Sequence, residues 1–238
     1  VLEQPLAVRS RIGYLPENCP VYPEMTVVDY LDYSASLRGI EEHQRPASIA
    51  KAIERTGLIE KADWLIANLS RGYRQRTGVA QAILHTPSIL ILDEPTVGLD
   101  PQARHLIWER LEILQQQGTT MLLTSHYLDE VEQLSNRVLI LDHGKVVAQG
   151  APPQLIKELV GIDVFVIEGT TAELDALEKS FKQCEATTER VNDKLYAYTQ
   201  EDCSRLESLL KNSRSWLRRP ANLEDLFIQL TGRSLRES

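Results

Sequence analysis

The sequence is poor in cysteine and in long apolar runs. Its three cysteines, Cys19, Cys184 and Cys203, are far apart and lack metal-ligand spacing, which excludes a disulfide framework and a zinc site and is typical of a reducing, intracellular compartment. We expect Cys184 and Cys203 to be buried thiols. No apolar run approaches the roughly 18–20 residues of a membrane span. Residues 1–5 contain neither an initiator Met nor a signal-peptide pattern, so we expect the chain to begin within its gene.

A strong positive charge is also missing. The 238 residues carry 26 Lys and Arg against 34 Asp and Glu, which gives a net charge of -8 and a pI near 5.2. No overall positive field therefore attracts the protein to nucleic acid, and any anion site must be local. With 42% hydrophobic and 25% charged residues, the chain has the composition of a globular protein with room for one or two domains.

The N-terminal part is predicted to combine helices with an α/β layer. Polar and apolar periodicity predicts helices over 26–37, 47–55 and 70–84, which form a helical subdomain at about 24–86. Beyond it, the sequence predicts buried strands at 89–92, 120–124 and 138–141, helices at 101–116 and 128–134, and a hairpin turn at 142–145. This order indicates an α/β domain with a parallel sheet over residues 1–150.

The C-terminal part is predicted to be a separate α+β domain. Glycine and proline at 150–153 mark a boundary, so we expect a linker helix at 151–160 and an accessory domain at 161–238. Its predicted elements are strands at 163–167, 187–191, 194–198 and near Trp216, and helices at 172–181, 203–209 and 223–230. This βαββαβ order indicates a ferredoxin-like fold.

The sharpest chemical feature is a pair of adjacent carboxylates, Asp93 and Glu94, directly after the apolar run 89–92. Open α/β sheets bind ligands at the carboxyl ends of their strands. One such carboxylate can hold Mg²⁺, usually through water, while its neighbour polarises an attacking water. Taken alone, the Asp-Glu-Pro triplet is equally typical of a solvated acidic turn.

Three further segments carry residues that suit a phosphate. Ser70 and Gly72 stand at a predicted helix start, where free N–H groups favour an anion, although an ordinary helix cap explains them in isolation. Asp100 follows Gly98 in a tight turn and is a natural helix cap. His126 follows a predicted strand and could contact a terminal phosphate, but a lone histidine there is more often structural.

In this order and at these spacings, the motifs resemble the ATP-binding subunit of an ABC transporter over nearly the whole chain. Segment 69–73, Leu-Ser-Arg-Gly-Tyr, is similar to the family's signature motif, 89–94 to its Walker B motif, 98–100 to its D-loop, 12–17 to its Q-loop, and His126 to its switch histidine. The resemblance implies a partial P-loop NTPase sheet with a helical subdomain.

The resemblance also implies catalytic roles. Asp93, with Glu17, would hold Mg²⁺, and Glu94 would be the general base for the attacking water. His126 would sense the γ-phosphate. Glu17 departs from the family pattern, because it stands where many members carry Gln.

The remaining motif residues are implied to serve a dimer. Ser70, Arg71, Gly72 and Tyr73 would contact the ATP held by the opposite subunit, and Asp100 would cross the dimer interface. Arg71 departs from the family pattern, because it replaces the usual second glycine of the signature motif.

The Walker A phosphate loop of this family cannot be found. No Gly-x-x-x-x-Gly-Lys-[Ser/Thr] segment occurs, and the Gly-Lys pair at 144–145 is followed by Val146. We therefore expect a fragment that lacks this loop and the first strands and that neither binds nor hydrolyses ATP alone. We also expect it to expose apolar sheet faces that favour self-association.

Details of the motifs resemble the ABC-2 type exporter branch, the drug, polysaccharide and gliding-motility group. They are Tyr-Arg-Gln-Arg at 73–76, Leu-Pro-Glu at 15–17 and the tail 223–233. The implied protein is an ATPase that sandwiches ATP in a homodimer or pseudo-dimer and drives an integral-membrane permease. It would lie at the cytoplasmic face of the membrane and contact the permease through residues 18–37.

Two other functions remain open from the sequence. One is a soluble ABC protein that acts on ribosomes or DNA, although the second cassette or coiled coil usual in that class is not visible. The other is a non-catalytic regulatory or interaction subunit that works through its C-terminal domain.

Overall fold

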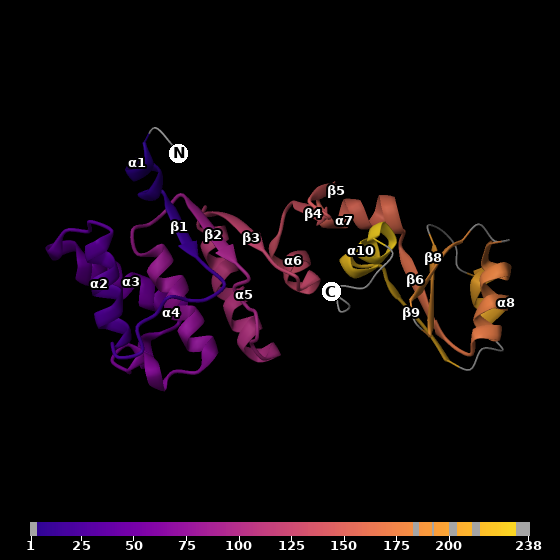
Figure 1. Cartoon of the computed structure of the whole chain (residues 1–238), viewed down its shortest axis with the longest axis horizontal. Helices are drawn as coiled ribbons and strands as arrows, with labels where there is room; N and C mark the ends of the chain where they lie inside the picture. The colour runs from indigo at the N-terminus through magenta and orange to yellow at the C-terminus, as the bar shows by residue number, and fades with distance from the viewer. Residues whose placement is uncertain (1–3, 183–185, 192, 200–203, 211–214, 232–238) are drawn as a thin grey trace. The chain divides into compact units, whose positions relative to one another are not determined.

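The computed structural model describes residues 4–182, 186–191, 193–199, 204–210 and 215–231 (Figure 1). Cys184 and Cys203, the expected buried thiols, lie outside these residues. The chain divides into two compact units, Val1–His126 and Tyr127–Ser238. This division falls before the domain boundary expected at residue 150.

The first unit contains a parallel sheet and several helices. Its elements are α1 (Pro5–Arg9), β1 (Ile12–Leu15), α2 (Val27–Leu37), η1 (Glu42–Gln44), α3 (Arg45–Thr56), η2 (Ile59–Lys61), η3 (Ile66–Asn68), α4 (Arg71–Ile83), β2 (Ile89–Asp93), α5 (Pro101–Gln116) and β3 (Thr120–Thr124). The predicted helices of this unit are therefore confirmed close to their expected bounds.

Local side chains fix where these helices begin and end. Thr26 caps α2 by accepting a hydrogen bond from the Asp29 N–H at 3.1 Å. Asp100 caps α5 in the same way, with 2.9 Å between its Oδ1 and the Ala103 nitrogen. Gly57 ends α3 in the left-handed region, at φ +65°.

The parallel sheet has the order β1-β2-β3, and one of its faces is buried. Leu15 of β1 and Leu92 of β2 lie opposite one another and are fully or almost fully buried. Helix α4 packs on β1 so closely that a Cβ atom on Gly13 would overlap the carbonyl oxygen of Ala82. This contact explains a glycine in the middle of a strand.

On the other face of the sheet, the prediction that 120–124 is a buried strand is wrong. The segment 120–124 forms the expected strand, but it is not buried: its residues alternate between half-buried and exposed, and Leu122 is 56% exposed. The reason is its place at the sheet edge, on a face where the described residues also leave Tyr14 46% exposed. Apolar sequence alone therefore overestimated the burial of this strand.

The second unit begins with a helix and a two-stranded sheet. Its elements are α6 (Leu128–Leu134), β4 (Val138–Asp142), β5 (Lys145–Gly150), α7 (Pro152–Leu155), the π-helical turn η4 (Ile156–Val160), β6 (Asp163–Glu168), α8 (Thr171–Lys182), β7 (Thr187–Val191), β8 (Lys194–Thr199), α9 (Ser204–Leu210), β9 (Ser215–Pro220) and α10 (Leu223–Thr231).

The strand β4 is a second departure from expectation. Among the described residues it pairs with β5 alone, antiparallel, and does not extend the parallel sheet. The turn between them is confirmed, with His143 at φ +47° and Gly144 at φ +73°. Val138 and Ile140 are buried in one cluster with Leu155 of the expected linker helix. This packing joins one face of β4 and residues 152–160 to the core of the second unit.

The ferredoxin-like prediction is confirmed. Strands β7-β8-β6-β9 form an antiparallel sheet in this order, and the helices α8 and α9 interrupt them along the chain. Phe165 and Leu195 of the sheet are fully buried together with Leu174 and Phe181 of α8. On the opposite face, Val164 and Tyr198 join the cluster that includes α10.

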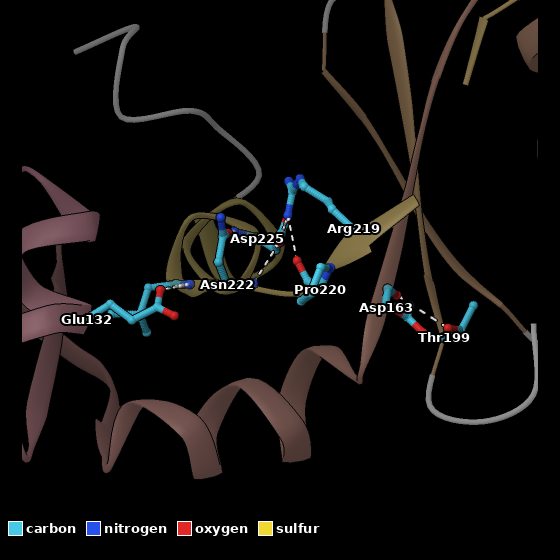
Figure 2. Close-up of polar contacts among 8 residues, drawn as sticks. Glu132, Asp163, Thr199, Arg219, Pro220, Asn222 and Asp225 are labelled. Atoms are coloured by element: carbon cyan, nitrogen blue, oxygen red, sulfur yellow. Dashed lines mark hydrogen bonds and ion pairs between the residues drawn. The ribbon is translucent and has the colours of Figure 1, made fainter. Parts of the chain in front are cut away.

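Helix α10 begins in a network of carboxylates (Figure 2). Asp225 is fully buried and accepts two hydrogen bonds from Arg219, at 2.6 and 2.8 Å, and one from the Asn222 N–H at 2.9 Å. The Asn222 side chain accepts in turn from the Asp225 N–H at 3.1 Å, and Glu132 of α6 accepts from the Leu223 N–H at 3.2 Å. Hydrogen bonding to Asp225 raises the pKa of Arg219. Side chains of the protein itself thus accept the hydrogen bonds of the free N–H groups at the start of α10.

Candidate functional site

The two predicted carboxylates lie at the carboxyl end of the central strand. Strand β2 runs between β1 and β3, and its last residue, Asp93, lies opposite Thr124 of β3. The Thr124 hydroxyl donates a hydrogen bond of 2.5 Å to the Asp93 Oδ1 atom. This bond holds one carboxylate oxygen of Asp93 at the carboxyl end of the sheet. Sequence reasoning missed Thr124, because its role depends on the register between two strands that are far apart in the chain.

Glu94 adopts a backbone conformation that is uncommon for a residue with a side chain. Its φ is +47°, in the left-handed region, and its N–H donates to the Thr124 carbonyl at 3.1 Å. Such conformations persist where surrounding contacts hold them, and they cluster at functional sites. Here the turn directs the side chain toward a histidine.

That histidine is His126, which the sequence analysis singled out for a different contact, with the γ-phosphate. Its Nδ1 lies 2.8 Å from the Glu94 Oε2, and its backbone N–H donates to the same oxygen at 3.4 Å. The Glu94 side chain is 20% exposed. The structure therefore brings together Asp93, Glu94 and His126 from the ends of two neighbouring strands, with an acid in reach of solvent and a partner that orients it.

Glu17 lies on a bend after β1, at the same edge of the sheet, because Leu15 is opposite Leu92 in the register. The Glu17 residue is exposed. Among the described residues, no three His, Cys, Asp or Glu side chains are grouped so that they could hold a metal ion by themselves. Any Mg²⁺ at Asp93 would therefore take most of its ligands from water and phosphate, which suits this ion.

The signature-like segment forms the start of α4. Ser70 is the helix cap and accepts from the Tyr73 N–H at 3.4 Å. The first turn of α4 contains no acidic residue, and Arg71 and Ser70 are exposed. Its N–H groups and its dipole therefore present positive charge outward. The arrangement suits an anion.

The ring of Tyr73 faces its own subdomain. The guanidinium carbon of Arg76 lies 4.1 Å from the ring centroid, and the Lys61 ammonium lies 5.7 Å from it. Arg74 donates to the carbonyls of Ile66 and Ala67 at 3.2 and 2.9 Å. These contacts anchor the helix start and leave the Ser70 cap exposed.

The turn that carries Asp100 lies against this helix start. Gly98 has φ +67°, and a Cβ atom on it would overlap the guanidinium of Arg71. A Cβ atom on Gly72 would lie 3.2 Å from the Cβ of Ala103 in α5. The predicted residues of the two motifs are thus neighbours, and the turn that carries Asp100 is tied to Glu94 by the bond from the Val97 N–H to the Glu94 carbonyl at 3.2 Å.

Comparisons with known proteins agree with this geometry. Residues 3–97 match the family model for ABC transporters, and residues 173–232 match the model for the C-terminal domain of the nodulation factor export protein NodI. A Nod factor export ATP-binding protein I from Cupriavidus metallidurans is 39% identical over 230 residues, covering 96% of this chain and 75% of the relative. One from Ralstonia nicotianae is 36% identical, covering 96% and 73%. The chain belongs to the ABC transporter ATP-binding family.

Solved structures of this family are similar as well. An ATP-binding subunit of an ABC transporter is 28% identical with a TM-score of 0.56, covering 66% of this chain and 65% of that one. CbiO1 from Clostridium perfringens, part of the ABC transporter complex cbiONQ, is 28% identical with a TM-score of 0.57, covering 63% and 61%. This chain thus spans slightly less than two thirds of each. No helix among the described residues is both long and apolar enough to span a bilayer.

Proposed function

We propose that the chain is the ATP-hydrolysing subunit of a membrane exporter and that two copies complete each other's ATP sites. Family membership supports ATP binding coupled to transport, and the names of the relatives, which are export ATP-binding proteins, favour export. The observation that carries the catalytic part is the Glu94–His126 pair, 2.8 Å apart at the end of β2.

Glu94 is the proposed general base. As water attacks the γ-phosphorus, its proton passes to the Glu94 carboxylate, the bond to the bridging β-phosphate oxygen breaks, and ADP and phosphate result. His126 orients this carboxylate through Nδ1 and is the proposed sensor of the γ-phosphate. The positive φ of Glu94 keeps the side chain beside His126, away from the ordinary continuation of the strand.

Asp93 is the proposed Mg²⁺ ligand. The Thr124 hydroxyl holds one carboxylate oxygen, which leaves a single oriented oxygen donor, and Mg²⁺ needs few protein ligands when phosphate and water supply the rest. Mg²⁺ held by Asp93 would neutralise charge on the phosphate oxygens. Glu17, exposed near the same edge, would take part through water.

The second half of each ATP site comes from the other copy. The Ser70 hydroxyl and the N–H groups of Arg71 and Gly72 would contact the terminal phosphates, since this helix start carries no acid of its own. Tyr73 would support them from behind, through its bond to Ser70. Asp100, exposed at the start of α5, would face the partner copy.

Residues 18–37 are the proposed contact with the integral-membrane permease, at the cytoplasmic face. Tyr22 is partly exposed here and packs edge-to-face on Tyr30 and Tyr33, with centroids 6.0 and 5.7 Å apart. The Tyr30 hydroxyl donates to the Pro20 carbonyl at 3.1 Å. This aromatic cluster gives the loop before α2 a rigid, partly apolar surface that suits a membrane partner.

The 238 residues contain no phosphate loop of the Gly-x-x-x-x-Gly-Lys-[Ser/Thr] type. Such a loop contributes several charge-assisted hydrogen bonds of about 1.5–3 kcal/mol each, whereas micromolar affinity amounts to only about 8 kcal/mol. We therefore propose that these residues alone do not turn over ATP, and the tests below use the native gene product that contains them.

The test is Glu94→Gln in that gene product. Removing a general base is expected to lower Mg-ATP hydrolysis about 100-fold or more, while ATP binding is retained. Glu109→Gln, an exposed change on α5, serves as the control and should leave turnover unchanged. Wild-type turnover by Glu94→Gln would contradict the assignment.

A further inference from the structure

The guanidinium of Arg71 lies close to the backbone of Gly98. A Cβ atom built on Gly98 would overlap the Nη1, Cζ and Nη2 atoms of this group, so three atoms of the guanidinium contact one point of the turn. Gly98 also has φ +67°, a conformation that side chains disfavour. The glycine therefore supplies the left-handed backbone and the room for the guanidinium, which an added Cβ would displace.

No ion pair accounts for the position of Arg71. Within the part of the chain that the structure describes, no carboxylate lies within salt-bridge distance of it, and the Asp100 carboxylate is used to cap α5. A cation in the first turn of a helix is also unfavourable next to the positive end of the dipole. The contact that the structure shows for the Arg71 side chain is with Gly98 in the turn.

Two backbone hydrogen bonds lie in the turn under Arg71. The Val97 N–H donates to the Glu94 carbonyl and the Leu99 N–H donates to the Thr96 carbonyl, both at 3.2 Å. On its other side, the Gly72–Ala103 approach joins α4 to α5 directly after Asp100. Arg71 and this helix contact thus bracket the turn from both ends.

We propose that Arg71 is a positioning residue that fastens the turn 97–100 to the start of α4. Ser70 and Asp100 then move as one piece, although they belong to different helices. The functional half of this inference rests on the proposed function, in which both residues face the second copy. The structural half does not, because the contact lies within one chain and needs no nucleotide.

The structural half is tested by amide hydrogen exchange of the native gene product without nucleotide. Arg71→Ala is expected to speed exchange at Val97 and Leu99 about 3- to 10-fold, and Arg71→Lys, which keeps the charge but lacks the planar group, to act in between. Unchanged exchange at both amides in Arg71→Ala would overturn the proposal.

Glycine variants provide a matched comparison. Gly98→Ala and Gly39→Ala introduce the same backbone strain, at φ +67° and +75°, but a Cβ on Gly39 meets nothing within 4 Å. Gly98→Ala should therefore speed amide exchange in its turn more than Gly39→Ala does in its own. In the double variant Arg71→Ala/Gly98→Ala, the Gly98→Ala change should add no more to exchange than Gly39→Ala does. An excess that persists without Arg71 would contradict the contact. If Gly98→Ala does not fold, the Arg71 variants decide.

Kinetics test the functional half. Both Arg71→Ala and Gly98→Ala are expected to lower kcat for ATP and to leave KM nearly unchanged, because Arg71 acts through the turn. A raised KM with unchanged kcat in Arg71→Ala, without an effect of Gly98→Ala, would assign the guanidinium to the phosphate and overturn the positioning role. Loss of exchange protection with no ATPase in the wild type would count against the proposed function alone.

Discussion

The N-termini of α4 and α10 differ in which groups accept hydrogen bonds from their free N–H groups. At α10, Asn222, Asp225 and Glu132 supply acceptors for the free N–H groups, and Arg219 neutralises the buried carboxylate. At α4, Ser70 supplies one long bond of 3.4 Å and the first turn carries no acid. The first start is complete within its unit, and the second is left suited to an anion from outside.

This difference distinguishes a helix start that is satisfied within the fold from one that is open to a ligand. A helix start that its own carboxylates have filled has little left to offer a ligand, whereas one that faces outward with a cation beside it can bind phosphate. We therefore expect changes at α10 to affect stability, and changes at α4 to affect catalysis.

The largest stability effect is expected for Asp225→Ala. Asp225 is fully buried and accepts from both the Arg219 side chain and the Asn222 N–H, so its removal should cost the second unit about 3 kcal/mol of unfolding free energy. Asp175→Asn, in the exposed pair with Arg190, is the control and should cost less than about 1 kcal/mol. Urea unfolding followed by circular dichroism measures both. Equal effects of the two changes would show that the α10 network is not the structural anchor described above.

A matched pair of cap variants sharpens the comparison. Asn222→Ala and Ser70→Ala each remove a side-chain cap, at an expected cost of about 1 kcal/mol or less, with the shorter bond of 3.1 Å at Asn222 giving the larger loss. ATPase activity should follow the opposite order, since only Ser70 is proposed to contact the ATP of the other copy. Thermal unfolding and steady-state turnover of both variants test these opposite orders. The same order of loss in stability and in activity would argue against the comparison.

The smallest effect is a pH dependence within the first unit. Burial raises the pKa of the Cys19 thiol from its ordinary value of 9.0 to about 12. Because the folded state favours the protonated thiol, its contribution to stability is full below pH 9.0 and decreases as the pH rises toward 12. In the native fold, Cys19 should thus react slowly with a disulfide reagent at pH 8. Reaction as fast as in urea would contradict this burial.

The elements of the fold were predictable from the sequence because their signals are local. Asp100 followed by Pro101 marks the start of α5, and Gly57 marks the end of α3. The pair Asp93 and Glu94 was predictable for the same reason, since an apolar strand ends in two acids.

Contacts between distant segments were not predictable in this way. The bond from Thr124 to Asp93 depends on strand register, and the contact of Arg71 with Gly98 depends on how two helices pack. The exposure of Leu122 likewise reflects its place at a sheet edge. An apolar strand has the same sequence whether both of its faces are covered or one.

The central claim, that each ATP site combines Glu94 of one copy with Ser70 of the other, is tested most directly by complementation. Ser70→Arg and Glu94→Gln should each abolish ATPase activity in the native gene product. Co-expressed, they form mixed pairs in which one site keeps both intact residues, so activity should recover to about a quarter of the wild-type value for random pairing in a two-fold dimer. No recovery in purified mixed pairs would contradict the shared site.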